Sequence, residues 1–298
     1  MIFEGNFPAV KRRDVLLGAA AFLFAPKAYA EVPSRIAAID WAMLETLMAL
    51  GETPVAATEL IQFRKDAIEP AIPDSVIDLG LRGSPNFELL HLIKPDLILI
   101  SPFYTRHQPA LEQIAPILSV PFYTRGEPPF EKALTAVTAL GERLGKQREA
   151  AELLAAIALR IEDMRGRLAG FAKRPTYLVN VGDARHVRVF GADSMFGDIL
   201  GRLGLPNAWT DVSRYTFAAP VPLENLAVEE NARIVIISDI PVEARDGLRN
   251  SMIWNALAPV REGRVITLDN INPYGGVAAG MRFERLLSTA LLAHGDAG

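Results

Sequence analysis

A helix-then-strand pattern that occurs twice, about half the chain apart, limits the possible folds of this chain more than any other feature. The first copy is ELLHLIKPDLILIS, from Glu88 to Ser101, and the second is ENLAVEENARIVIIS, from Glu224 to Ser238. Each copy begins with an acid near leucine at helical spacing, breaks at a polar or proline step, and ends in an apolar strand closed by serine. Two copies of one unit predict two similar α/β lobes, with a cleft between them as the natural place for a ligand.

Short apolar strands and helices alternate through most of the chain, which indicates parallel sheets covered on both faces. In the first half we predict strands at 35–40, 55–57, 76–80, 97–101 and 117–122, and helices at 41–50, 86–93 and 108–114. In the second half we predict strands at 176–179, 187–190, 234–238 and 265–268, and helices at 194–203 and 278–294.

Between these two series, residues 146–165 contain neither glycine nor proline and carry apolar side chains at helical spacing. Extended to residue 169, the segment predicts one helix about 36 Å long. The expected fold is therefore α/β, with two lobes of mainly parallel sheet joined by a single long helix. We assign 31–143 to the N-terminal lobe, 144–170 to the bridging helix and 171–298 to the C-terminal lobe.

The first thirty residues have the pattern of an export signal. Lys11, Arg12 and Arg13 are followed by an apolar run at 15–25 and by the small-x-small sequence Ala28-Tyr29-Ala30. The run is too short to span a bilayer. Twin-arginine and general export both remain possible.

The chain has no cysteine, so no lipid can be attached to one and no disulfide can form. We expect a soluble, unanchored periplasmic protein. A formal net charge of −4 also argues against nucleic acid as a partner.

A search for catalytic chemistry returns little. The chain lacks a G-x-S-x-G elbow, a phosphate-binding loop of the P-loop type and a G-x-G-x-x-G motif after a strand. The four histidines, His91, His107, His186 and His294, lack the spacing of a metal site. We therefore expect neither an enzyme nor a protein-ligated transition metal.

Arginines and tyrosines gather instead where the predicted strands end. Arg82 follows the strand at 76–80, Tyr104 and Arg106 follow 97–101, and Tyr123 and Arg125 follow 117–122. Loops after parallel strands line the ligand crevice of α/β lobes, so these side chains are candidates for one site. Arginine offers forked donors and tyrosine offers a ring with a hydroxyl, which suits a bulky ligand with exposed oxygens.

Three blocks of sequence resemble the periplasmic ferric-hydroxamate siderophore-binding proteins. The blocks are PDSVIDLGLRGSPNFELL at 73–90, KPDLILIS at 94–101 and ARHVRVFGADSMFGDILGRLGLPNAW at 184–209. The resemblance covers nearly the whole chain after residue 30. It implies two α/β lobes joined by one long helix, little opening or closing, and delivery of the ligand to an inner-membrane ABC permease.

The same resemblance implies roles for single residues. Arg82 matches an arginine that contacts hydroxamate oxygens around iron, and Tyr104 matches a tyrosine that hydrogen-bonds the same group. Tyr274 and Gly275 match a Tyr-Gly pair at the rim of the second lobe, and Trp209 matches the tryptophan of an Asn-Ala-Trp string.

The chain also departs from that pattern. Thr216, flanked by Tyr215 and Phe217, stands where the ferrichrome binders have a pocket tryptophan, and Asp66 and Asn272 align with two further tryptophans. The pocket is thus less rich in indole, and the particular siderophore stays open.

The acids that begin the two repeats gain a second interpretation from the resemblance. Glu88 and Glu224 match glutamates that proteins of this fold present, one per lobe, to arginines of the permease. An acid in the first turn of a helix is also stabilised by the helix dipole, by about 0.3–1 kcal/mol. Docking is the interpretation that we favour, because both acids take equivalent positions.

The sequence therefore predicts a monomeric periplasmic protein that binds an iron(III)-hydroxamate siderophore through Arg82, Tyr104, Arg106, Trp209, Tyr215, Phe217 and Tyr274, without a cofactor of its own. The siderophore's oxygens complete the coordination of iron, so the protein needs no metal ligands. Two alternatives stay open. One is the same fold carrying a catecholate siderophore, haem or cobalamin, and the other is a periplasmic α/β enzyme.

Overall fold

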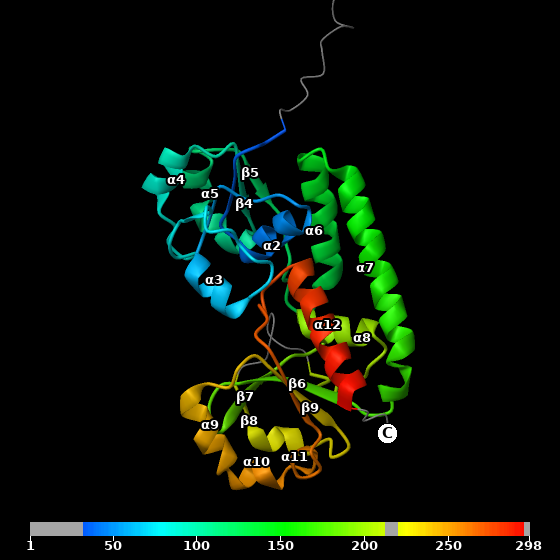
Figure 1. The fold of residues 1–298 in the computed structure, drawn as a ribbon. Coiled ribbons are helices and arrows are strands. Elements are labelled where there is room, and N and C mark those ends of the chain that lie inside the picture. The colour runs from blue at the N-terminus through cyan, green and yellow to red at the C-terminus, as the bar shows by residue number, and fades with distance from the viewer. Residues whose placement is uncertain (1–31, 212–219, 295–298) are drawn as a thin grey trace, which may run out of the picture. The chain divides into compact units, whose positions relative to one another are not determined.

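The computed structural model describes residues 32–211 and 220–294, so the predicted export signal lies outside the described residues. Within residues 33–298, which form one unit, the strands fall into two five-stranded sheets from separate halves of the sequence (Figure 1). Their orders are β3-β2-β1-β4-β5 and β10-β9-β6-β7-β8. The predicted α/β class with mainly parallel sheets is confirmed.

All the strand pairs of the first sheet are parallel. Its elements are β1 (Ile36–Ala38), α2 (Trp41–Ala49), β2 (Ala56–Ala57), α3 (Leu60–Asp66), β3 (Ile77–Asp78), α4 (Phe87–Ile93), β4 (Leu97–Ile100), the 3-10 helix η2 (Pro102–His107), α5 (Gln108–Leu111) and β5 (Ile117–Ser119). β4 is apolar and buried at every position, as a strand covered on both faces should be. β1 and β4 are neighbours that lead the chain in opposite directions, to β2 and to β5. The carboxyl ends of strands at such a switch point border a crevice that α/β proteins use for ligands.

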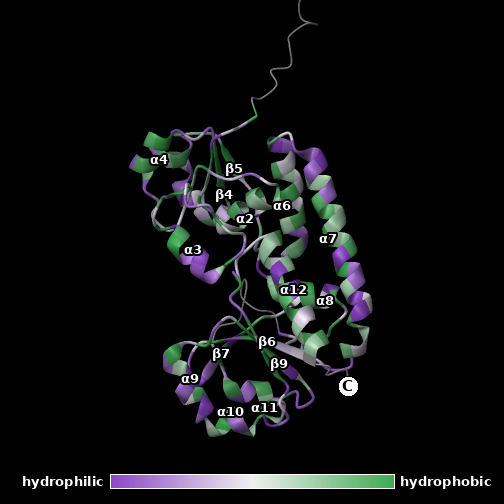
Figure 2. Cartoon of the chain, viewed as in Figure 1, coloured by the Kyte–Doolittle hydropathy of each residue, from purple (hydrophilic) through white to green (hydrophobic). Residues whose placement is uncertain are grey.

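Two helices follow the first sheet and pack side by side (Figure 1). They are α6 (Phe130–Arg143), which the sequence analysis missed, and α7 (Gln147–Arg167), followed by η3 (Ala169–Phe171). α7 is slightly shorter than the helix predicted at 146–169. A Cβ atom at Gly141 would lie only 2.7 Å from the Cβ of Ala150, so glycine is required where these helices approach most closely. Figure 2 shows hydrophilic and hydrophobic residues in alternation along α7, whereas β4 and β5 are hydrophobic.

The second sheet is parallel on one side and antiparallel on the other. Its elements are β6 (Thr176–Val181), β7 (His186–Val189), α8 (Met195–Arg202), β8 (Val221–Pro222), η4 (Leu223–Ala227), β9 (Arg233–Ile237), α9 (Val242–Arg249), α10 (Met252–Ala256), α11 (Ala258–Arg261), β10 (Val265–Leu268) and α12 (Val277–His294). β6, β9 and β10 pair in parallel, while β7 and β8 run antiparallel. Asp183 Oδ1 accepts hydrogen bonds from the backbone N–H groups of Arg185 and His186, which closes the tight turn between β6 and β7. That turn returns the chain as a hairpin.

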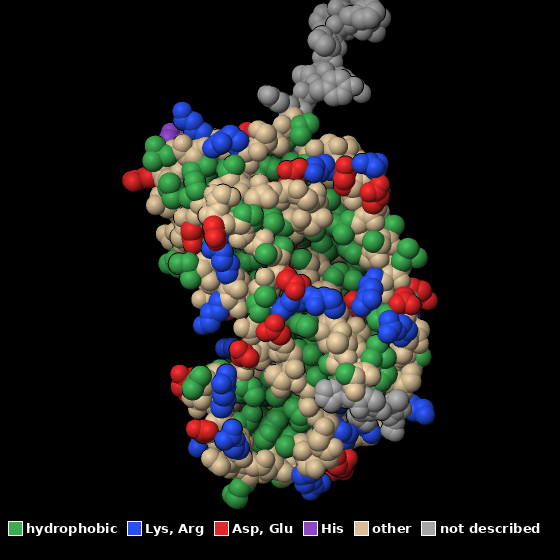
Figure 3. Space-filling view, in the orientation of Figure 1, with side chains coloured by type: hydrophobic (Ala, Val, Ile, Leu, Met, Phe, Trp, Pro, Cys, Tyr) green, Lys and Arg blue, Asp and Glu red, His purple; other side chains and the backbone are tan. Residues whose placement is uncertain are grey.

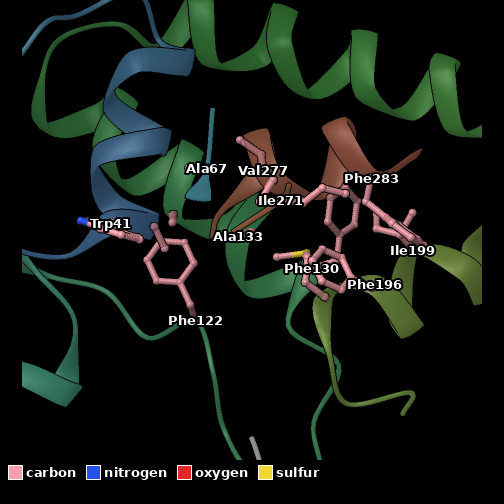
Figure 4. Close-up of a cluster of buried hydrophobic side chains, with 14 of the residues drawn as sticks. Trp41, Ala67, Phe122, Phe130, Ala133, Phe196, Ile199, Ile271, Val277 and Phe283 are labelled. Carbon is pink, nitrogen blue, oxygen red and sulfur yellow. The ribbon is translucent and has the colours of Figure 1, made fainter. Parts of the chain in front are cut away.

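One hydrophobic cluster contains side chains from both sheets, among them Leu99 of β4 and Val235 of β9. Its centre holds Phe130, Phe196 and Phe283, and the ring centroids of Phe196 and Phe283 are 5.0 Å apart (Figure 4). α12, which the sequence analysis assigned to the C-terminal lobe, packs against α2 and α6 as well as α8. The lobe boundaries proposed from the sequence stay a prediction.

No helix among the described residues has the length and apolar character needed to cross a membrane.

Candidate functional site

Arg82 lies just beyond β3, at the carboxyl edge of the first sheet, and Glu59 holds it in place. The Arg82 backbone N–H donates to Glu59 Oε1 at 3.2 Å, and its Nε donates to Glu59 Oε2 at 2.5 Å. The guanidinium carbon stands 3.7 Å from the centroid of the Trp41 ring, a cation–π geometry. Neither bond to Glu59 uses the Nη nitrogens of Arg82. The result is a flat, oriented guanidinium at the predicted crevice.

The Trp41 ring beneath that guanidinium is itself held in place by two contacts. Its Nε1 donates to the backbone carbonyl of Thr58 at 3.0 Å, and its ring meets Phe63 edge-on with the centroids 5.1 Å apart. Trp41 begins α2, whose N-terminus is capped by Asp40 through a bond from the Met43 N–H at 3.0 Å. The ends of β1, β2 and β3 thus together fix the position of Arg82.

Tyr104 and Asp40 lie at the ends of β4 and β1, the two strands at the switch point. Burial raises the pKa of Tyr104 above its ordinary value, while a hydrogen bond with Arg82 opposes that shift. Burial also raises the pKa of Asp40, although bonds from the Met43 N–H and the Ser101 hydroxyl favour its charged form. Ser101 Oγ donates to Asp40 Oδ2 at 2.8 Å. Arg82 and Tyr104, predicted separately, therefore meet in one polar cluster.

Arg106 supports the loop that carries Arg82. Its Nη2 donates to the backbone carbonyl of Gly83 at 2.9 Å, and its Nε donates to His107 at 3.1 Å. The side chain was predicted as a ligand contact, and its position next to Gly83 gives it a second task in shaping the Arg82 loop. Arg125, the other arginine of the repeated PFYTR string, is exposed.

Tyr123 and Tyr274 lie together where the chain returns from β10 to α12. Tyr123 Oη donates to the carbonyl of Gly275 at 2.6 Å, and the two tyrosine rings are 6.1 Å apart at an angle of 76°. Burial raises the pKa of Tyr123 well above its ordinary value. Tyr123 therefore joins the two halves of the sequence, whereas Tyr274, 42 % exposed, is accessible to a ligand.

Tyr274 also borders a pocket of about 640 Å³ that lies mostly at the carboxyl edge of the second sheet. Its charged residues are Lys65, Asp66, Arg188, Asp239, Glu243 and Arg245. Figure 3 shows a notch with basic and acidic side chains at its edges between α3 and α9, the helices that bring Lys65 and Arg245 to this pocket. The formal charges of these three basic and three acidic side chains sum to zero. Arg82 and Tyr104 belong to the neighbouring cluster on the first sheet and do not line this pocket.

The other predicted contacts, and the residues that stand in place of tryptophans, divide into three groups. Trp209 packs against the core of the second sheet, where its backbone N–H donates to Asn207 Oδ1 at 3.0 Å. Asp66 lines the pocket and accepts from Gln62, but Asn272 is buried. Tyr215, Thr216 and Phe217 lie outside the described residues.

Sequence reasoning missed Glu45, a fully buried acid on α2. Its Oε1 accepts from Asn272 Nδ2 at 2.7 Å, and its Oε2 accepts from the backbone N–H groups of Gly276 and Ala279 at 2.8 and 3.1 Å. Burial raises its pKa from 4.5 to about 7 against these donors. The signal was present in the sequence, since Glu45 is the one charged residue in the apolar run 41–50. Asn272 Oδ1 in turn accepts from the Tyr274 N–H, so Glu45 fixes the segment that carries Tyr274.

Glu88 and Glu224 are both exposed, each as the second residue of its helix. Asn86 caps α4 through a bond from the Leu89 N–H at 2.9 Å. The second repeat differs from the first, because Glu224 lies in the short 3-10 helix η4 instead of an α-helix.

The described residues contain no group of three or more histidine, aspartate or glutamate side chains that could hold a metal ion. Arg82 and Tyr104 can donate hydrogen bonds to anionic oxygens, and the exposed rings of Phe103 and Tyr274 offer aromatic surfaces. This chemistry suits recognition of a ligand.

The fold and this site are those of a ligand-binding protein, and the chain belongs to the family described as periplasmic binding protein, whose profile matches residues 36–271. Over 259 residues it is 32 % identical to the iron(3+)-hydroxamate-binding protein FhuD of Escherichia coli K12, covering 87 % of each chain. It is 25 % identical over 239 residues to the Fe(3+)-citrate-binding protein YfmC of Bacillus subtilis, covering 80 % of this chain and 73 % of that one.

Among solved structures, the siderophore-binding protein FhuD of Vibrio cholerae with bound Fe3+-Desferal matches with a TM-score of 0.81 and 25 % identity. That match covers 87 % of this chain and 98 % of the other.

Proposed function

We propose that this chain is a periplasmic binding protein that captures an iron(III)-hydroxamate siderophore and delivers it to an inner-membrane ABC permease. The observation that carries the proposal is that Arg82, stacked on Trp41, meets Tyr104 at the switch point of the first sheet. The similarity to hydroxamate-binding proteins in sequence and in structure supports the same ligand class.

The chemistry of the ligand explains why such a site suffices. In a ferric hydroxamate complex the siderophore's own oxygens surround the iron, so the metal is cargo and the protein supplies no ligand to it. The protein must instead donate hydrogen bonds to the hydroxamate oxygens and cover the organic backbone. Arg82 and Tyr104 are placed for the first task, and the exposed ring of Tyr274 for the second. We infer that the chain is a carrier and not an enzyme, in keeping with a family of binding proteins.

We propose that the permease docks on Glu88 and Glu224, one from each half of the sequence. Both carboxylates are exposed, and neither lines the pocket at the second sheet. Exposed acids at matching places can pair with permease arginines without disturbing the bound siderophore. We also propose that residues 1–30 direct export, that the protein acts as a monomer, and that no nucleic acid or cofactor takes part.

Titration followed by tryptophan fluorescence tests the proposed ligand. Trp41 lies directly under Arg82, so a bound ferric chelate should quench its emission. We expect saturable one-to-one quenching by the iron(III) complex of ferrichrome and much weaker binding of the iron-free siderophore, whose hydroxamates are uncharged and not yet arranged around a metal. Equal binding of both forms, or of neither, would contradict the proposal.

A further inference from the structure

Glu59 is the unexplained residue of this site. It occupies the N-cap position of α3, yet its side chain makes no capping hydrogen bond. Asp78 takes that role by accepting from the Leu60 N–H at 3.0 Å. The Glu59 backbone has φ 51°, the left-handed conformation that residues other than glycine seldom adopt. A simple role in helix capping therefore does not account for Glu59.

Both carboxylate oxygens of Glu59 are directed to Arg82 instead. One accepts from the Arg82 backbone N–H and the other from its Nε, and the Glu59 N–H donates to the carbonyl of Gly80 at 2.8 Å. Glu59 thus holds the segment from Gly80 to Arg82 through its carboxylate and its backbone N–H. It orients the guanidinium, and it also cancels the positive charge that this group would otherwise present to a ligand.

Charge compensation extends over the rest of the site. On the first sheet, Asp40 adds a second carboxylate near Arg82, and Arg106, bound to the carbonyl of Gly83, is the second cation. The neighbouring pocket is lined by three basic and three acidic side chains. A site that has no excess of positive charge has nothing to offset the desolvation of a multiply anionic ligand.

From these contacts we propose that Glu59 is a specificity determinant, which by orienting and neutralising Arg82 makes the site accept uncharged ferric chelates and reject multiply anionic ones. The inference rests on the proposed function and narrows its ligand class. An iron(III) trihydroxamate carries no net charge, because three hydroxamate anions balance the metal. An iron(III) tris-catecholate is triply anionic, and the carboxylate of Glu59 would repel it.

The test compares the affinities of two chelates in the wild type and in Glu59→Gln. The substitution removes the negative charge while keeping the size and one acceptor oxygen. Dissociation constants would be measured for iron(III)-ferrichrome and for an iron(III) tris-catecholate, and their ratio would be the readout. Asp74→Asn is the matched control, because it removes one acid from an ion pair away from Arg82, the pair of Asp74, in the turn before β3, with Arg64 of α3 at 3.6 Å.

We expect the wild type to favour ferrichrome strongly, and Glu59→Gln to shift the ratio toward the catecholate by about tenfold or more. The Asp74→Asn ratio should match that of the wild type. A general loss of folding would weaken the binding of both chelates together and leave the ratio of their dissociation constants unchanged. An unchanged ratio in a folded Glu59→Gln protein that still binds ferrichrome overturns the role of Glu59 alone. A wild type that binds no ferric hydroxamate overturns the proposed function as well.

Discussion

The buried carboxyl of Glu45 should make the stability of this protein fall as the pH rises. Its pKa in the folded chain is about 7, against 4.5 as the ordinary value, because burial outweighs the three N–H groups that donate to it. Between these two pH values the folded state keeps a proton that the unfolded state has released. The free energy of unfolding therefore decreases from about pH 4.5 to about pH 7 and then levels off with respect to this group.

The size of the effect follows from the shift. A difference of about 2.5 pKa units, at about 1.4 kcal/mol per unit, amounts to about 3.5 kcal/mol. Glu45→Gln isolates this contribution, because the amide cannot titrate and any fixed cost of its altered hydrogen bonds is the same at every pH. Relative to the wild type, the variant should gain about 2.5 kcal/mol of unfolding free energy between pH 5 and pH 8, because the rest of the effect falls below pH 5.

Urea denaturation at several pH values, followed by fluorescence, would measure both proteins. Parallel curves of unfolding free energy against pH for wild type and Glu45→Gln would refute the reasoning. They would mean that the donors from Asn272, Gly276 and Ala279 keep Glu45 ionised despite its burial.

Two further predictions follow from packing and from surface charge. Gly276→Ala would place a Cβ atom 2.8 Å from the carbonyl oxygen of Ala42, so we expect a loss of about 1–3 kcal/mol of unfolding free energy in urea denaturation, and an unchanged midpoint would contradict the packing. The double variant Glu88→Lys/Glu224→Lys should bind ferric siderophore with nearly wild-type affinity yet fail to support growth on it as sole iron source, whereas Glu142→Lys on α6 should grow normally. Normal growth of a stably folded double variant would leave these acids with only a local role in their helices.

The sequence was sufficient to predict the central strands but not every strand direction. β4 is wholly apolar and β9 is apolar after Arg233, so their burial follows from composition, and both strands were predicted. β7 runs antiparallel to β6, which strand periodicity alone cannot indicate, although the four residues between them are a hairpin length. The amphipathic helix α6 was overlooked although its apolar positions recur at helical spacing.

The site was predictable only where single residues carry the signal. Arg82 and Tyr104 were found from their positions after strands and from the resemblance, and the structure brings them into contact. Glu59 and Trp41 were missed as partners of Arg82, because these contacts arise when β1, β2 and β3 align their carboxyl ends. Pairings across a sheet depend on strand order, which local patterns do not specify.

The central claim is that Arg82 binds the oxygens of a ferric hydroxamate, and calorimetric titration of the chain without residues 1–30 tests it most directly. Wild-type protein should bind one equivalent of iron(III)-ferrichrome, and Arg82→Ala should lose about 2–5 kcal/mol of binding free energy. Arg148→Ala, which alters an exposed arginine on α7, should bind as the wild type does. An Arg82→Ala protein that is folded and binds iron(III)-ferrichrome with wild-type affinity would contradict the account.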